Sequence, residues 1–134
     1  MKKLTAEILK HLEDRKWDNL NPGDVAKSIS IEAAELLELF QWKNPTLAEF
    51  KKEKAKIEDL KGELADILIY CLELTALLNL DAEKIIRAKL EKVQKKYPAE
   101  LFQKMEVDSP EFKAAYLKIK NQHRATRARK AAKN

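Results

Sequence analysis

Apolar residues recur at helical spacing through most of the chain. The first such stripe consists of Leu4, Ile8, Leu9 and Leu12. It predicts a helix from about Thr5 that ends by Trp17. Residues 18–23 are polar and contain Pro and Gly, which predicts a turn. A second helix should then run from an N-cap at Asp24 to about Trp42.

Start and stop signals predict further helices. Thr46 and Glu49 have the spacing of a capping box, and the helical stretch that follows extends to Leu78 with a break near residues 54–56. Asp81 should cap a fourth helix, which must stop before Pro98 because proline disfavours the helical conformation of the preceding residue.

The C-terminal part predicts one more helix. Ser109, Pro110 and Glu111 form a cap and first turn, and apolar residues follow at helical spacing. Beyond Gln122 we expect fraying or disorder.

Composition supports an all-α protein with a small core. The 134 residues include only two glycines and four prolines, while Ala, Leu, Glu and Lys are abundant. The single cysteine, Cys71, lies in an apolar run, so we interpret it as core filler and expect a reducing, cytoplasmic location. The N-terminus does not resemble a signal peptide, and the longest apolar run, residues 67–78, is too short to cross a membrane.

Charge is distributed unevenly. The net charge is +5, but eight basic residues and no acidic one lie from Lys113 onward, so residues 1–112 are acidic overall. The basic tail could contact nucleic acid through phosphates. It contains no aromatic residue after Tyr116 and follows no recognition-helix pattern, so we treat nucleic-acid binding as an alternative function.

Carboxylates on the second predicted helix form a row. Glu32, Glu35 and Glu38 are each three residues apart and therefore project to similar sides. Glu35 and Glu38 also fit an ordinary solvated face. Glu32 does not, because helical geometry places it between Leu36 and Leu39, inside the arc that should be core.

The third predicted helix repeats the anomaly. Glu63 falls in the same sector as Ile67 and Tyr70, with Asp66 beside it. From residue 64 to residue 78 the only charged residues are Asp66 and Glu73, so this helix should be largely buried. Burying an ionised carboxylate costs several kcal/mol unless it is paired, protonated or bound to a cation.

Two helices that each carry a carboxylate pair can build one oxygen-lined pocket. Oxygen ligands select hard cations, so the pattern predicts Mg²⁺, with Mn²⁺ as the alternative. The two histidines, His11 and His123, lie outside both motifs, which argues against iron or zinc. Mg²⁺ commonly shares its coordination shell with substrate phosphates, which indicates a phosphate-bearing ligand.

Three segments carry a family resemblance: residues 28–42 (SISIEAAELLELFQW), 63–70 (ELADILIY) and 95–98 (KKYP). They resemble the MazG-like nucleotide pyrophosphohydrolases, closest to the compact branch that includes the dCTP pyrophosphatases. The resemblance covers roughly residues 12–98 and implies a four-helix bundle. Glu-x-x-Glu followed by Glu-x-x-Asp is its signature, and the Phe-Gln-Trp and Tyr-Pro groups make it specific.

The resemblance implies hydrolysis of a (deoxy)nucleoside triphosphate between the α and β phosphates, in a house-cleaning role. It assigns the Mg²⁺ ligands to Glu32, Glu35, Glu63 and Asp66. Glu38 would lie behind the ligands or act as general base.

The same resemblance suggests contacts with the nucleoside and phosphates. Trp17 and Trp42 match aromatic positions that contact the base, although each could pack in the core. Tyr70 could pack on the sugar or fill the core, and Lys89 could reach the phosphates or be solvated. Asn21 and Val93 depart from the dCTP-type pattern, so the preferred base stays open.

We therefore expect a MazG-like domain in residues 1–98, and a C-terminal helix with a basic, partly disordered tail in residues 99–134. The resemblance implies a homodimer or homotetramer. A non-enzymatic helical interaction protein is the other alternative, in which the carboxylates only form salt bridges with neighbouring lysines.

Overall fold

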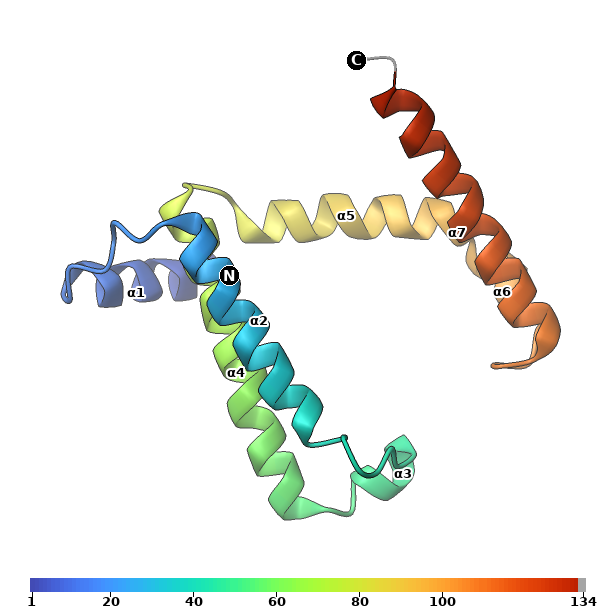
Figure 1. The fold of residues 1–134 in the computed structure, drawn as a ribbon, viewed down its shortest axis with the longest axis horizontal. Coiled ribbons are helices and arrows are strands. Elements are labelled where there is room, and N and C mark those ends of the chain that lie inside the picture. Colours follow the sequence, from blue (N-terminus) through green and yellow to red (C-terminus); the bar gives the residue numbers. More distant parts are fainter. Residues whose placement is uncertain (133–134) are drawn as a thin grey trace. The chain divides into compact units, whose positions relative to one another are not determined.

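The computed structural model describes residues 1–132, except for the side chains of Arg127 and Lys130. Lys133, the last basic residue of the predicted tail, lies outside the described residues. Within residues 1–132 the chain is helical without any strand, which confirms the all-α class (Figure 1). The helices are α1 (Lys2–Glu13), α2 (Pro22–Glu38), α3 (Leu47–Phe50), α4 (Lys54–Leu77), α5 (Ala82–Lys96), α6 (Ala99–Phe102) and α7 (Pro110–Ala131). None of the helices in this range is long and apolar enough to span a bilayer.

Residues 1–85 form one compact unit, built around α4. Helix α2 packs antiparallel along α4, and α1 packs against α4 as well (Figure 1). The apolar stripe of α1 supplies Ile8 and Leu12 to a small core with Leu72 and Ala82.

The residues from 86 onward form a second compact unit, which aromatic contacts hold together. Tyr97 at the end of α5 stacks on Tyr116 of α7, with ring centroids 5.2 Å apart. Phe102 of α6 meets Phe112 of α7 edge to face, also at 5.2 Å. These rings give the short helix α6, which the sequence pattern did not predict, its packing partners.

The predicted helix starts at Thr46, Asp81 and Ser109 are confirmed. The Thr46 hydroxyl accepts from the backbone N–H of Glu49 at 3.3 Å, and the Glu49 carboxylate accepts from the N–H of Thr46 at 2.8 Å. Asp81 accepts from the Lys84 N–H, and Ser109 accepts from the Phe112 N–H, both at 3.1 Å. The break after the capping box is also present, between α3 and α4.

The predicted bounds of the second helix are wrong. Helix α2 begins at Pro22 with Asn21 as N-cap, so Asp24 lies in its first turn. Proline at this position suits a helix start because it has no N–H to leave unpaired. The helix ends at Glu38, and the rings of Phe40 and Phe50 then pack 5.1 Å apart, which draws the chain toward α3.

Two other predicted bounds are corrected. Helix α1 begins at Lys2 and ends at Glu13. Helix α7 does not fray after Gln122 but continues to Ala131. Its last turns are rich in Ala, Lys and Arg, which favour helix even without packing.

Much of α4 is more exposed than the sequence pattern predicts. Leu64, Leu68 and Ile69 are 44%, 54% and 44% exposed, and the only buried residues of the helix are Leu72 and Glu73. The prediction of a largely buried helix is wrong for the single chain, because α1 and α2 cover only part of its circumference.

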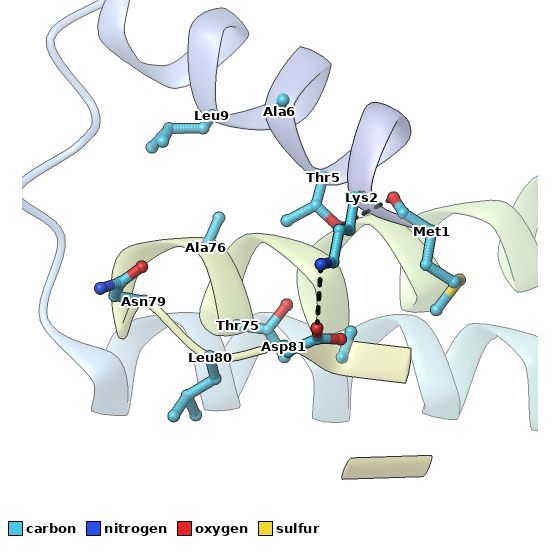
Figure 2. Close-up of a pocket in the computed structure, with 11 residues that line it drawn as sticks. Met1, Lys2, Thr5, Ala6, Leu9, Thr75, Ala76, Asn79, Leu80 and Asp81 are labelled. Atoms are coloured by element: carbon cyan, nitrogen blue, oxygen red, sulfur yellow. Dashed lines mark hydrogen bonds and ion pairs between the residues drawn. The ribbon is translucent and has the colours of Figure 1, made fainter. Parts of the chain in front are cut away.

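The start of α1 is tied to the turn between α4 and α5. Lys2 forms an ion pair with Asp81 at 3.7 Å, beside a hollow of about 300 Å³ (Figure 2). The Thr5 hydroxyl donates to the Met1 carbonyl at 3.2 Å. None of the predicted site carboxylates lines this hollow.

Glu73 is the one charged residue among the buried residues of this unit. Its side chain is 4% exposed, and within the described chain its Oε1 has no hydrogen-bond partner. Desolvation raises the pKa of its carboxyl above the ordinary value, while the charge of His11 acts in the opposite direction. Ionisation of Glu73 therefore opposes folding.

We predict that Glu73→Gln stabilises the free protein at pH 7, by about 1–3 kcal/mol, because it removes a buried charge. The native state binds this proton more tightly than the unfolded state, so wild-type stability falls as pH rises through the raised pKa. The advantage of the variant should shrink at pH 4, where the carboxyl is largely protonated in both states. Urea unfolding at the two pH values measures it, and a Glu73→Gln penalty that is larger at pH 7 than at pH 4 would contradict the prediction.

Candidate active site

Packing of α2 against α4 brings three predicted ligands together. Carboxylate oxygens of Glu32, Glu63 and Asp66 all lie within 4.8 Å of one another. Glu32 and Glu63 are half-buried, and Asp66 is exposed. The three carboxylates that helical spacing singled out in the sequence therefore meet between the two helices.

The donor set suits a hard divalent cation. Mg²⁺ binds oxygen at about 2.0–2.1 Å, so two ligands of one ion lie at most about 4.2 Å apart. The observed limit of 4.8 Å requires only a small inward movement of flexible carboxylates. No nitrogen or sulfur ligand belongs to the cluster formed by the described residues, so zinc is not favoured.

Desolvation and mutual repulsion both disfavour the ionised carboxylates of this site. Desolvation raises the pKa of Glu32, and the charges of Glu35, Asp66 and Glu63 add to the shift. The pKa of Glu63 is raised by desolvation and then by Glu35 and Asp66, with smaller contributions from Asp59 and Glu38. A bound cation would relieve this repulsion.

The other two acidic residues of α2 lie at the edge of the cluster. Glu35 is exposed and outside the three-residue cluster, but its charge acts on both Glu32 and Glu63. Glu38, the last residue of α2, is exposed and acts on Glu63. Both are therefore near enough to serve in the roles that the sequence predicts, which stay predictions.

A cavity of about 600 Å³ adjoins the carboxylates. Asp66 belongs to both the cluster and the cavity wall. Two predicted nucleoside-binding residues, Trp17 and Tyr70, also line the cavity. The remaining lining residues are Leu4, Glu7, Ile8, His11, Leu12, Leu20, Ser28, Ile69 and Glu73.

The end of α1 places Trp17 at this cavity. Lys16 adopts a left-handed conformation with φ of 59°, and the Trp17 N–H donates to the Leu12 carbonyl at 2.9 Å. This left-handed turn ends the helix and reverses the chain. The Trp17 ring then meets the edge of His11, with centroids 6.2 Å apart, and is half exposed.

Two predicted substrate-binding residues are not among those that line this cavity. Trp42 is in the loop after α2, where it is 87% exposed. Lys89 is on α5, in the second unit, and lines a separate cavity of about 630 Å³. The cavity around Lys89 is basic and also contains Val93, one of the positions that depart from the family pattern.

Glu73 and His11 are cavity residues to which the sequence pattern assigned no function. Glu73 was visible as a charge within an apolar run. The sequence spacing of His11 gives no sign that it is a cavity residue, because its position at the cavity depends on how α1 packs against α4.

The chain is therefore an all-α protein in which two packed helices carry paired acidic motifs and form a candidate divalent-cation site. The chain belongs to the MazG-like family, whose model matches residues 27–112. It is 32% identical over 93 residues to dCTP pyrophosphatase 1 of Mus musculus, a match that covers 66% of this chain and 53% of the mouse protein. The Homo sapiens protein of the same name is 30% identical over 93 residues, with the same coverage.

A solved structure supports the fold of this unit. A pyrophosphatase from Archaeoglobus fulgidus is 35% identical, with a TM-score of 0.65, and the match covers 73% of this chain and 92% of that one. The chain spans about half the length of the curated relatives it matches.

We predict that millimolar Mg²⁺ raises the melting temperature by several degrees, because a ligand at about 100 times its Kd stabilises the folded state by roughly 2.7 kcal/mol. The shift should decline as pH falls through the raised pKa values of Glu32 and Glu63, since protons compete with the cation. Glu63→Gln should lose the shift. Glu58→Gln, an exposed residue on the same helix that pairs with Lys61, is the matched control and should keep it. Equal melting temperatures with Mg²⁺ and with a chelator would argue against a metal centre.

Proposed function

We propose that the chain hydrolyses (deoxy)nucleoside triphosphates to the monophosphate and pyrophosphate in a Mg²⁺-dependent reaction that removes unwanted nucleotides from the pool. The observation that carries the proposal is the convergence of Glu32, Glu63 and Asp66 beside a cavity large enough for a nucleoside. The pyrophosphatase names of the relatives support the same chemistry.

In this proposal the carboxylates would bind the metal ion and the aromatic residues would bind the nucleoside. Glu32, Glu63 and Asp66, with Glu35 beside them, would hold Mg²⁺, or Mn²⁺ in its place. The bound cation would neutralise phosphate charge and make a nearby water more acidic. Trp17 and Tyr70 would enclose the nucleoside, and the aromatic faces suit a planar base.

Glu38 is our candidate for the base that receives a proton from the attacking water. It continues the carboxylate row at the end of α2 and is exposed, so it can exchange protons with solvent. Its charge acts on Glu63, which places it near the ligands without being one of them.

We also propose that two or four copies assemble. Ile31 and Leu37 on α2 are 56% and 68% exposed, and Leu64 and Leu68 on α4 are 44% and 54% exposed. Apolar surface of this kind on both helices that carry the site favours burial against another copy. Trp42 and Lys89, which do not line the cavity of the single chain, would join the site in such an assembly.

We predict that Glu63→Gln lowers kcat/KM for triphosphate hydrolysis at least about a hundredfold, because the cation site supplies several kcal/mol of transition-state stabilisation. Pyrophosphate release from canonical and modified nucleoside triphosphates with Mg²⁺ measures it. Glu58→Gln should retain wild-type turnover. No pyrophosphate release from any triphosphate would overturn the proposed activity and would favour a non-enzymatic interaction protein.

Nucleic-acid binding is a second candidate, supported by the basic cavity of the second unit. It brings together Lys89, Lys92, Lys95, Lys96, Lys120, His123 and Arg124 around the stacked pair of Tyr97 and Tyr116. Clustered basic side chains can contact a phosphate backbone.

We predict that deletion of residues 121–134 leaves kcat/KM for nucleotides within about twofold of wild type, because neither the carboxylates nor the adjoining cavity includes those residues. The same deletion should weaken any binding of single-stranded RNA, with a reduced salt dependence. Loss of nucleotide hydrolysis on deletion, in a protein whose helical content falls only by the deleted turns of α7, would instead place the tail in the active site.

A further inference from the structure

Glu73 is a buried acidic group that the proposed catalytic chemistry does not use. It is 4% exposed, and among the described residues its Oε1 lacks any hydrogen-bond partner. An unsatisfied buried acceptor is destabilising, and an apolar residue of similar size would pack at that position without this penalty. This oxygen is itself closed off from solvent, but Glu73 lines the adjoining cavity, so a donor bound there would reach Oε1 once the carboxylate turns toward it.

The position of Glu73 on α4 indicates what that donor is. Asp66, Ile69, Tyr70 and Glu73 have i, i+3, i+4, i+7 spacing and all line the 600 Å³ cavity. Asp66 also belongs to the carboxylate cluster, and Glu73 lies seven residues further along, roughly 10 Å at 1.5 Å per residue. One face of α4 thus leads from the candidate cation site, past an aromatic ring, to a buried acceptor.

A nucleotide held at the cluster by its phosphates would extend along this face. The phosphates themselves are excluded from the Glu73 end, since an anion would be repelled by the carboxylate. Trp17 and Tyr70 border the space between, and their flat faces suit a base better than a sugar. Ile8 and Leu12 add apolar walls, so a hydrogen bond formed there would be shielded from water.

We propose that Glu73 is a specificity-determining residue that accepts a hydrogen bond from an amino group on the nucleobase. The inference rests on the proposed function, because it assumes that nucleotides occupy this cavity. Amino groups of cytosine and adenine supply the missing donor. The keto oxygens of uracil and hypoxanthine at the equivalent positions would face the carboxyl oxygen, leaving two acceptors opposed.

Two pairs of substrates test this assignment: dCTP with dUTP, and dATP with dITP. In the second member of each pair a keto oxygen replaces the amino group, and the adjacent ring nitrogen carries a proton. In the wild type, kcat/KM should be about tenfold or more higher for the amino member of each pair. This ratio corresponds to the free energy of one hydrogen bond to a charged group. Glu73→Gln should bring both ratios to within about twofold of unity, because an amide can turn its oxygen to an amino group or its NH₂ to a keto oxygen. Glu58→Gln, exposed on the same helix, should keep the wild-type ratios.

Binding provides a readout that does not depend on hydrolysis. Calorimetric titration with dCMP and dUMP should show the same amino preference in the wild type and its loss in Glu73→Gln. Glu73→Leu, which keeps the volume but offers no polar atom, should weaken dCMP binding about tenfold and leave dUMP binding unchanged or stronger. A preference seen in binding without any pyrophosphate release would remove the proposed function but keep the base contact.

Other outcomes would overturn the inference. Amino-to-keto ratios that stay the same in wild type and Glu73→Gln would show that the carboxyl does not contact the base. A Glu73→Gln protein that is more stable but has unchanged ratios would show that Glu73 is only a buried structural charge. Absence of monophosphate binding to the wild type, with hydrolysis intact, would also count against it.

Discussion

Repulsion among carboxylates that packing forces together is the constraint on which this structure depends. Apolar contacts align α2 with α4, and this alignment places Glu32, Glu63 and Asp66 within 4.8 Å of one another. Desolvation raises the pKa values of Glu32 and Glu63, and the charges of the neighbouring carboxylates raise them further. A fold that only needed stability would not concentrate like charges at a helix interface, so the cluster is a candidate cation site.

The same two helices explain why the single chain leaves so much apolar surface uncovered. Each helix uses one side to hold its partner and the carboxylates, and α1 covers only the C-terminal part of α4 through contacts such as Leu12 with Leu72. Leu37 and Leu68 are consequently 68% and 54% exposed. The two helices that carry the candidate site are therefore also the helices with exposed apolar surface.

The sequence was sufficient to predict features that depend on local rules. Caps at Thr46, Asp81 and Ser109 follow from side chains that bond to the backbone three residues away, and the carboxylate pairs follow from helical periodicity. Features set by tertiary contacts were not predictable. The end of α2 depends on Phe40 meeting Phe50, and the cavity wall at His11 depends on how α1 lies on α4. The exposed faces of α4 were misjudged because periodicity shows that a face is apolar, not what covers it.

Glu73 shows how local and tertiary information combine. In the sequence it is only a charge in an apolar run, which periodicity alone reads as an imperfection. The structure adds that the charge is buried, that its Oε1 is unpaired within residues 1–132, and that it shares a cavity wall with Asp66. Each fact alone has an ordinary explanation. Together they place an acceptor without a donor on the wall of a cavity that also reaches the candidate cation ligands, and the proposed nucleotide would account for both features with a single molecule.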